Sequence, residues 1–277
     1  MRAVVIQTPG SVAADTVTDP IPGPRDVVVK VAACGICGTD VHILDGEFPP
    51  TPYPIVPGHE FTGEIVELGS EVTERGLGEL VAVDPSLFCG ECEFCVVGHG
   101  NMCLRWGAIG DTVDGAAAEY VRAPARNCYP LPAGTDLAKA ALIEPLSCAV
   151  RGYDQLPRTI GSHYLIYGAG TMGLLMAQLA PRAGAVSVSV VDLNTERLRT
   201  ADALGVDATA TSADELADDH PRGWDVVIDC TGAIPAIEDG VRRVRPTGTF
   251  QQFGVAAGDA VATISPFAVY NNEITIV

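Results

Sequence analysis

The sequence predicts an α/β protein with two domains, a small β-barrel followed by a doubly wound parallel sheet. The chain has 277 residues, of which 47% are hydrophobic, and this exceeds one ordinary domain. Short strand-like segments broken by Gly and Pro continue to about residue 147, and a strand, helix, strand pattern follows. We therefore place the domains at residues 1–147 and 148–277.

In the first domain, the predicted strands combine strand-forming residues with turn residues at their ends. They are Arg2–Thr8, Asp26–Ala33, Phe61–Leu68, Glu79–Asp84 and Glu119–Ala123. The proline-rich run from Pro49 to Pro54 cannot lie inside a helix, so we expect it to be extended and to lead the chain to Gly58-His59-Glu60.

In the second domain, apolar strands alternate with helices. The predicted strands are His163–Tyr167, Ala185–Val191, a short one near Ala208, Trp224–Asp229, Gly248–Phe253 and Glu273–Val277. The predicted helices are Leu174–Arg182, Thr195–Leu204 and Ile234–Val244. This alternation is typical of a doubly wound sheet.

Composition excludes some classes of partner and compartment. The net charge of −18 repels phosphate backbones and anionic membranes, so we expect neither nucleic acid nor membrane binding. The N-terminal apolar run from Met1 is too short for a signal peptide, which predicts a cytoplasmic protein. Nine cysteines in such a chain favour metal binding or catalysis over disulfides.

The stretch from Cys34 to His42 reads Cys-Gly-Ile-Cys-Gly-Thr-Asp-Val-His, and His59-Glu60 follows at some distance. These are zinc ligand types with proton-handling groups beside them, and a catalytic zinc takes three such ligands. Alone, Cys34 and Cys37 also fit a redox pair or half of a structural zinc knot, and His42 also fits a surface histidine.

A second set of cysteines has the spacing C-x2-C-x2-C-x7-C in a segment with little apolar periodicity. Four thiolates so close together suit a closed, tetrahedral structural zinc. An iron–sulfur cluster is the main alternative. The residues are Cys89, Cys92, Cys95 and Cys103.

The third motif predicts a dinucleotide site. A G-x-G-x-x-G lies between a predicted strand and helix, and Asp192 follows nineteen positions after its last glycine. The glycines allow a tight turn and close approach of a pyrophosphate, and Asp192 would accept hydrogen bonds from the adenosine ribose, which favours NAD over NADP. The predicted cofactor-binding residues are Gly168, Gly170, Thr171, Met172, Gly173 and Asp192, with Thr231 at the end of another strand.

By these motifs, in this order along the whole chain, the sequence resembles the zinc-dependent medium-chain dehydrogenases, the alcohol and polyol dehydrogenase family. The resemblance implies a GroES-like barrel that carries both zinc ions and a Rossmann domain that binds NAD(H). The stretch Leu142-Ile143-Glu144-Pro145-Leu146-Ser147 looks like the polyol branch of that family.

The resemblance also implies individual roles. Cys37 and His59 would ligate the catalytic zinc, with Glu60 or Glu144 in the third position, and Asp40 would orient the ligating histidine. In the polyol branch, the Glu of the His-Glu pair, here Glu60, can ligate the metal, and the Glu of the Glu-Pro pair, here Glu144, can lie behind the zinc-bound water.

Further roles follow from the same resemblance. Thr39 and His42 would relay the substrate proton to solvent, and Arg197 would lie near the adenosine ribose. The implied activity is zinc-dependent, NAD-linked interconversion of a secondary alcohol or polyol and its ketone. The implied assembly is a homodimer or homotetramer.

Alternatives remain open at this point. Threonine or a simple alcohol would suit the same machinery, a zinc-free quinone reductase would share the architecture, and a zinc-knot adaptor would use the four cysteines without catalysis. Family members also return to the barrel domain after their last Rossmann strand. This chain ends at Ile274-Thr275-Ile276-Val277, so we expect that segment to be missing.

Overall fold

The computed structural model describes residues 1–48 and 51–277. Residues 49 and 50, which begin the run predicted to be extended, lie outside the described residues. The chain divides into two compact units, Met1–Pro145 and Leu146–Val277. Helix α3 (Ile143–Asp154) runs through the boundary.

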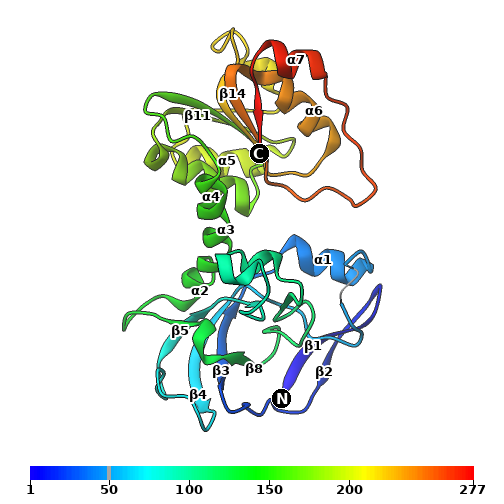
Figure 1. Ribbon diagram of the computed structural model, residues 1–277, viewed down its shortest axis with the longest axis vertical. Helices are drawn as coiled ribbons and strands as arrows, with labels where there is room; N and C mark the ends of the chain where they lie inside the picture. The colour runs from blue at the N-terminus through cyan, green and yellow to red at the C-terminus, as the bar shows by residue number, and fades with distance from the viewer. Residues whose placement is uncertain (49–50) are drawn as a thin grey trace. The chain divides into compact units, whose positions relative to one another are not determined.

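The first unit is built on an antiparallel sheet with the strand order β8-β3-β4-β5-β9 (Figure 1). Its strands are β3 (Asp26–Cys34), β4 (Phe61–Leu68), β5 (Leu80–Val83), β8 (Tyr120–Pro124) and β9 (Cys128–Pro130). Antiparallel pairing also joins β1 (Arg2–Thr8) to β2 (Ser11–Thr16), and β6 (Ser86–Leu87) to β7 (Gly107–Ala108).

The core of this unit consists of side chains from one face of the sheet. Val27 and Val29 of β3, Ile65 of β4 and Val81 of β5 are fully buried there. Helix α1 (Gly38–Asp45) follows β3, and α2 (Leu137–Ala140) follows β9. The side chain of Thr62 ties β4 to α2 by donating a hydrogen bond to the carbonyl oxygen of Leu137 at 2.7 Å.

The second unit is a parallel sheet, with the strand order β12-β11-β10-β13-β14-β15 in residues 146–277. Its strands are β10 (Ser162–Tyr167), β11 (Ala185–Val191), β12 (Ala208–Ala210), β13 (Trp224–Asp229), β14 (Val244–Gln252) and β15 (Thr275–Ile276). Its helices are α4 (Thr171–Leu179), α5 (Thr195–Ala203), α6 (Ile234–Arg243) and α7 (Pro266–Asn271).

Both faces of this sheet are covered, as a doubly wound sheet requires. Along β10, Tyr164 and Ile166 face a core that includes Met176 of α4, while Leu165 faces a core that includes Ile237 of α6. Figure 1 shows these helices around the sheet. The strand order reverses between β11 and β13 on either side of β10, so the ligand-binding edge lies at the carboxyl end of β10.

The predicted strands Arg2–Thr8, Phe61–Leu68, Ala185–Val191 and Trp224–Asp229 are confirmed. The expected start of β14 at Gly248 was wrong. The strand begins at Val244 and continues through Pro246-Thr247-Gly248, where Thr247 has a φ of 67°. A register shift in the pairing of β13 with β14 absorbs these turn residues, so they do not end the strand.

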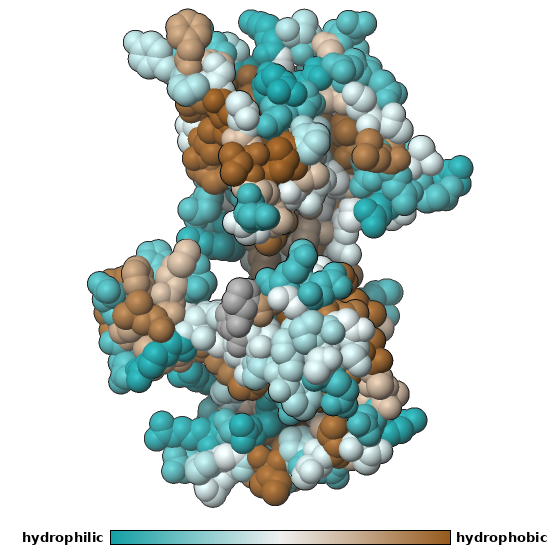
Figure 2. Space-filling view, turned by 90° about the vertical axis from the view of Figure 1, so that its right-hand side faces the viewer, coloured by the Kyte–Doolittle hydropathy of each residue, from teal (hydrophilic) through white to brown (hydrophobic). Residues whose placement is uncertain are grey.

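The surface retains exposed apolar side chains. Figure 2 shows that hydrophobic residues gather in patches on the surface of each unit, and that hydrophilic residues surround these patches. Within residues 1–48 and 51–277, none of the helices combines the length and the apolar composition that a membrane crossing needs.

Candidate active site and cofactor sites

The end of β3 and the start of α1 present the first candidate ligand. Cys37 is the residue before the helix, with extended backbone angles, and its N–H donates to the carboxylate of Asp40 at 2.7 Å. The acidic residue of a capping box makes this contact, and it fixes the direction in which the helix begins. A second oxygen of Asp40 accepts from the N–H of Gly58 at 3.1 Å, so one carboxylate ties both ligand-bearing segments together.

The side chains of Cys37, His59 and Glu60 converge. One ligand atom from each lies within 4.8 Å of the others, and both His59 and Glu60 are buried. Glycines provide the necessary room, because a Cβ at Gly35 would lie 2.3 Å from a carboxylate oxygen of Glu60. Sulfur, imidazole nitrogen and carboxylate oxygen form a donor set that suits zinc. The residues present therefore fit this metal.

The electrostatics of the cluster favour a cation. Burial alone would lower the pKa of His59, but the neighbouring side chains of Asp111 and Cys37 and the charges of Asp111 and Asp40 raise it to about 11. Burial raises the pKa of Glu60, and the charge of His59 acts in the opposite direction and lowers it. The carboxylates that stabilise a protonated imidazole would also stabilise a divalent ion beside it.

The two residues of the predicted relay both lie on α1. The Thr39 hydroxyl is 3.8 Å from the Cys37 sulfur, so it borders the ligand cluster. His42 lies one turn further along at the surface, where its Nδ1 is 2.7 Å from the carboxylate of Glu47. Residues at i and i+3 share one face of a helix, so Thr39 and His42 lie on the same face of α1.

Glu60, and not Cys34, belongs to the converging set among the described residues. Glu144 lies in the first turn of α3. Burial raises the pKa of Cys34 to about 12, and the charges of Asp40 and Glu60 act in the same direction. Cys34 is therefore held as a neutral thiol next to the site.

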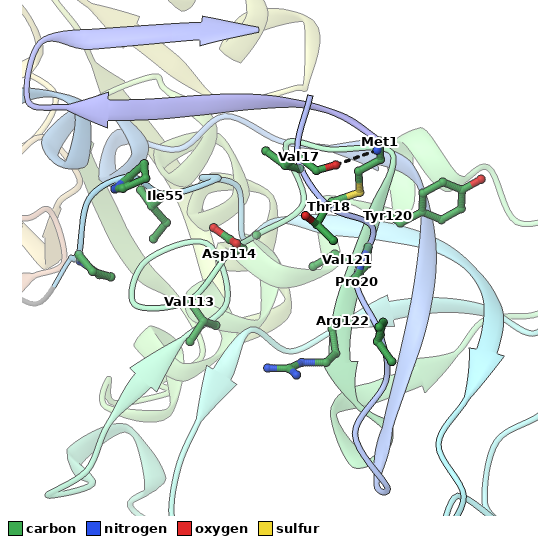
Figure 3. Close-up of a pocket in the computed structure, with 14 residues that line it drawn as sticks. Met1, Val17, Thr18, Pro20, Ile55, Val113, Asp114, Tyr120, Val121 and Arg122 are labelled. Atoms are coloured by element: carbon green, nitrogen blue, oxygen red, sulfur yellow. Dashed lines mark hydrogen bonds between the residues drawn. The ribbon is translucent and has the colours of Figure 1, made fainter. Parts of the chain in front are cut away.

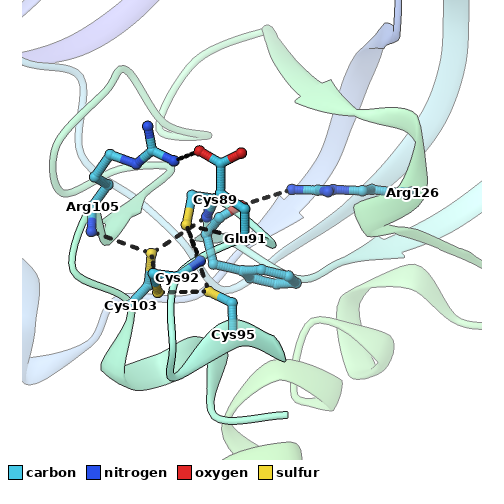
Figure 4. Close-up of polar contacts among 8 residues, drawn as sticks. Cys89, Glu91, Cys92, Cys95, Cys103, Arg105 and Arg126 are labelled. Carbon is cyan, nitrogen blue, oxygen red and sulfur yellow. Dashed lines mark hydrogen bonds and ion pairs between the residues drawn. The ribbon is translucent and has the colours of Figure 1, made fainter. Parts of the chain in front are cut away.

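The four predicted cysteines form a compact cluster between β6 and β7 (Figure 4). Their sulfur atoms approach one another at 3.4 to 4.0 Å without forming disulfides. Backbone N–H groups point at the sulfurs, including that of Cys92 to Cys89 at 3.3 Å and that of Arg105 to Cys103 at 3.2 Å. Such donors stabilise thiolates, which are the form that binds metal.

The charge around the cluster supports the same interpretation. The backbone N–H of Glu91 and the guanidinium of Arg105 lower the pKa of Cys89 to about 6. The side chain of Arg105 also pairs with Glu91, as Figure 4 shows. A four-sulfur set with this polarity could hold a structural zinc.

The glycine loop after β10 has the geometry of a pyrophosphate site. Gly168 has a φ of 98°, and a Cβ at Gly173 would lie 1.7 Å from the carbonyl oxygen of Gly168, so α4 packs directly on the loop. A Cβ at Gly170 would meet open space, and Thr171 and Met172 begin the helix after it. The helix N-terminus is thus open to an anion.

The acidic residue after β11 is fixed by backbone groups. Asp192 accepts from the N–H of Ala169 and from that of Asn194, both at 2.7 Å, and Arg197 lies 3.9 Å from it. On the other side of the loop, a Cβ at Gly168 would contact the Thr231 methyl group at 3.0 Å. Both Asp192 and Thr231 therefore lie at the predicted cofactor edge of the sheet.

Sequence reasoning missed one residue of the metal site. Asp111 is buried, and its Oδ1 is 3.4 Å from the Nδ1 of His59, closer than the 3.7 Å that separates Asp40 from the same nitrogen. It lies in a tight turn more than fifty residues after His59, in a stretch without a recognisable motif. Only the folded structure brings it to His59.

Comparison with known proteins identifies the family. The family model described as "Alcohol dehydrogenase GroES-like domain" matches residues 23–133, and "Zinc-binding dehydrogenase" matches residues 171–277. The chain is 37% identical to D-arabinitol dehydrogenase 1 of Uromyces fabae, over 91% of this chain and 74% of the relative. It is 35% identical to sorbitol dehydrogenase of Halalkalibacterium halodurans, over 86% and 72% of the two chains.

Solved structures agree with these matches. A zinc-binding dehydrogenase from Sinorhizobium meliloti 1021, bound to NADP, is 38% identical and superposes with a TM-score of 0.95, covering 99% of this chain and 82% of that one. The predicted fold class, a GroES-like domain followed by a Rossmann domain, is confirmed. This chain belongs to the zinc-dependent medium-chain alcohol dehydrogenase family, and it is a dehydrogenase.

Proposed function

We propose that this protein oxidises a secondary alcohol or polyol to the ketone with NAD⁺, and that it holds its catalytic zinc through Cys37, His59 and Glu60. The observation that carries the proposal is the convergence of these three ligand types beside the Thr39 hydroxyl. The similarity to arabinitol and sorbitol dehydrogenases supports a polyol as the substrate class.

A bound zinc ion would supply Lewis acidity, which lowers the pKa of an alcohol. The residues of this chain would do the rest. Thr39 would accept the hydroxyl proton of the substrate, and His42 would pass it to solvent. The glycine loop from Gly168 to Gly173 would hold the pyrophosphate of the dinucleotide, which carries the hydride chemistry.

The direct test is an NAD⁺ reduction screen with arabinitol, sorbitol, butanediol, threonine and simple alcohols, combined with zinc analysis. We expect turnover of at least one polyol and its loss after zinc is removed. Turnover of threonine or ethanol alone would contradict the polyol assignment, and undiminished turnover in the zinc-free protein would contradict the metal assignment.

We further propose two zinc ions per chain, one at the Cys37 site and one bound by Cys89, Cys92, Cys95 and Cys103, in a homodimer or homotetramer that works in the cytoplasm. The separation of the two ligand sets supports the metal count. Elemental analysis and light scattering test the metal content and the assembly.

Substitutions at Thr39 and His42 test the proton path. Thr39→Val removes the hydroxyl beside the ligand cluster, so we expect nearly all alcohol oxidation to be lost, whereas Thr39→Ser should retain much of it. Histidine exchanges protons near neutral pH, so His42→Gln should lose roughly 10-fold or more. Steady-state rates across pH, with and without added imidazole, measure both effects.

The defect of His42→Gln should shrink as pH rises or imidazole is added, because an external base then replaces the side chain. Glu47→Ala is a matched control, since it removes the surface partner of His42 and leaves the imidazole in place. If His42→Gln has the rate and pH profile of the parent, the proton leaves by another route.

Asp192 tests the cofactor preference. Its carboxylate would repel the 2′-phosphate of NADP⁺, so we expect a higher kcat/KM with NAD⁺ than with NADP⁺. In Asp192→Ala the ratio of these two values should fall by roughly 10-fold, about 1.4 kcal/mol. Asp192→Asn keeps an acceptor for the Ala169 N–H and removes only the charge, so it separates repulsion from loop support. The measurement is kcat/KM with each cofactor. Equal efficiency in the parent would refute the assignment.

A further inference from the structure

We propose that Asp111 is a positioning residue that holds the zinc ligand His59 from behind, through a hydrogen bond between its carboxylate and the Nδ1–H of the imidazole. The inference rests on the proposed function, because it assumes that His59 binds zinc. It adds a carboxylate that the motif around Cys37 does not contain.

Two buried polar atoms face each other without other partners. The Nδ1 of His59 and the Oδ1 of Asp111 are 3.4 Å apart, and neither has a hydrogen-bond partner among the described residues. Their residues are 7% and 6% exposed, so water does not readily satisfy either atom. A buried donor and acceptor left unpaired cost about 1–3 kcal/mol each, so a small rotation that joins them is favoured.

The turn that carries Asp111 is fastened to the segment before His59. Backbone hydrogen bonds run from Gly115 to Val56 at 2.7 Å and from Ala116 to Gly58 at 2.8 Å. The Val56 N–H donates to the side chain of Asp114 at 2.9 Å. These contacts hold the turn and the histidine segment in one register.

Glycines bring the two backbones into direct contact. A Cβ at Gly110 would lie 2.5 Å from the carbonyl oxygen of Gly58, and one at Gly115 would lie 2.4 Å from the same atom. Val113 and Asp114 of this turn and Ile55 line a cavity of about 430 Å³, and Figure 3 draws these side chains. Asp111 is therefore placed by rigid backbone packing, and not by a flexible loop.

Asp40 also lies beside His59, but both of its oxygens are already engaged. Its two oxygens already accept from the backbone N–H groups of Cys37 and Gly58, and it is 3.7 Å from the His59 ring. Asp40 thus ties the ligand segments together, and Asp111 has an oxygen free for the imidazole. A carboxylate on Nδ1 selects the tautomer in which Nε2 is unprotonated and available to a metal.

The test compares zinc affinity in the full-length parent and in Asp111→Ala, which removes the acceptor, by competition with a coloured chelator. Loss of such a partner usually weakens metal binding about 10- to 100-fold, so we expect this change in the Kd of the Cys37 site. The four-cysteine site should be unchanged and serves as an internal reference. In steady state kcat should fall while the KM for NAD⁺ stays the same.

Asp114→Ala is the matched control, because it removes the side-chain acceptor that ties the same turn to Val56 and leaves the carboxylate that faces His59. It should lower the thermal unfolding temperature without changing zinc affinity. If Asp111→Ala binds zinc as the parent does, or Asp114→Ala weakens zinc binding equally, the inference is overturned. A parent with zinc only at the four cysteines would overturn the proposed function as well.

A second measurement uses the parent protein alone, so it does not require that a variant folds. In the zinc-loaded parent with ¹⁵N-labelled histidine, we expect the Nδ1–H of His59 to give a resonance protected from exchange with water. A rapidly exchanging Nδ1–H, or a protonated Nε2, would overturn the assignment of Asp111.

Discussion

Cys37→Ser should reduce kcat/KM for alcohol oxidation roughly 10³-fold or more, since about 4 kcal/mol of transition-state stabilisation would be lost with the metal. The variant should still fold, because serine is itself a favoured residue before a helix and can replace Cys37 at the start of α1. Steady-state kinetics, zinc content and circular dichroism together measure this. We expect one zinc ion to remain, bound by the four cysteines.

Cys34→Ser provides a control with the same chemical change three positions earlier. Its thiol lies next to the site and outside the converging ligand set, so its zinc content should match that of the parent. A Cys37→Ser protein that keeps its activity would show that the thiol does not bind the catalytic zinc.

Cys92→Ser should destabilise the protein by removing one of four ligands from a closed site. A loss of about 4 kcal/mol would lower the thermal unfolding midpoint by about 8–16 °C in a protein of this size. Calorimetry with and without a chelator measures the effect. The chelator should lower the midpoint of the parent far more than that of the variant, because the variant has already lost its zinc.

Glu93→Gln is the control within the same loop, since Glu93 is exposed and its carboxylate is not among the converging ligands. Its unfolding midpoint should equal that of the parent. An unchanged midpoint in Cys92→Ser, or iron in place of zinc in the purified protein, would refute a structural zinc at this cluster.

Much of the fold was readable from local pattern. Strands such as Ala185–Val191 and Trp224–Asp229 were predicted to the residue, because apolar runs bounded by Gly or Asp leave little choice. Helix α1 was missed because Thr39, Val41 and Ile43 are poor helix formers, and the contact between Cys37 and Asp40 decides the local structure. The hairpin strand β2 was missed because all its residues are exposed.

Some residues of the candidate site could also be predicted from local sequence, and others could not. Spacing alone grouped the four cysteines, and a motif in context placed the glycine loop. The third ligand stayed open between Glu60 and Glu144, because its choice depends on how segments far apart in sequence meet. Asp111 could not be found at all, since its closeness to His59 depends on glycine packing between Gly58 and Gly110.

The start of α1 has a consequence for protein engineering. Because Cys37 is both a candidate metal ligand and the residue that begins the helix, the direction of the helix that carries Thr39 and His42 is set at that candidate ligand. A designer who moves the ligand also moves the proton path. The segment from Cys37 to Glu47 should therefore be transplanted between relatives as one cassette, and piecemeal exchange within it should give chimeras that bind zinc but turn over slowly.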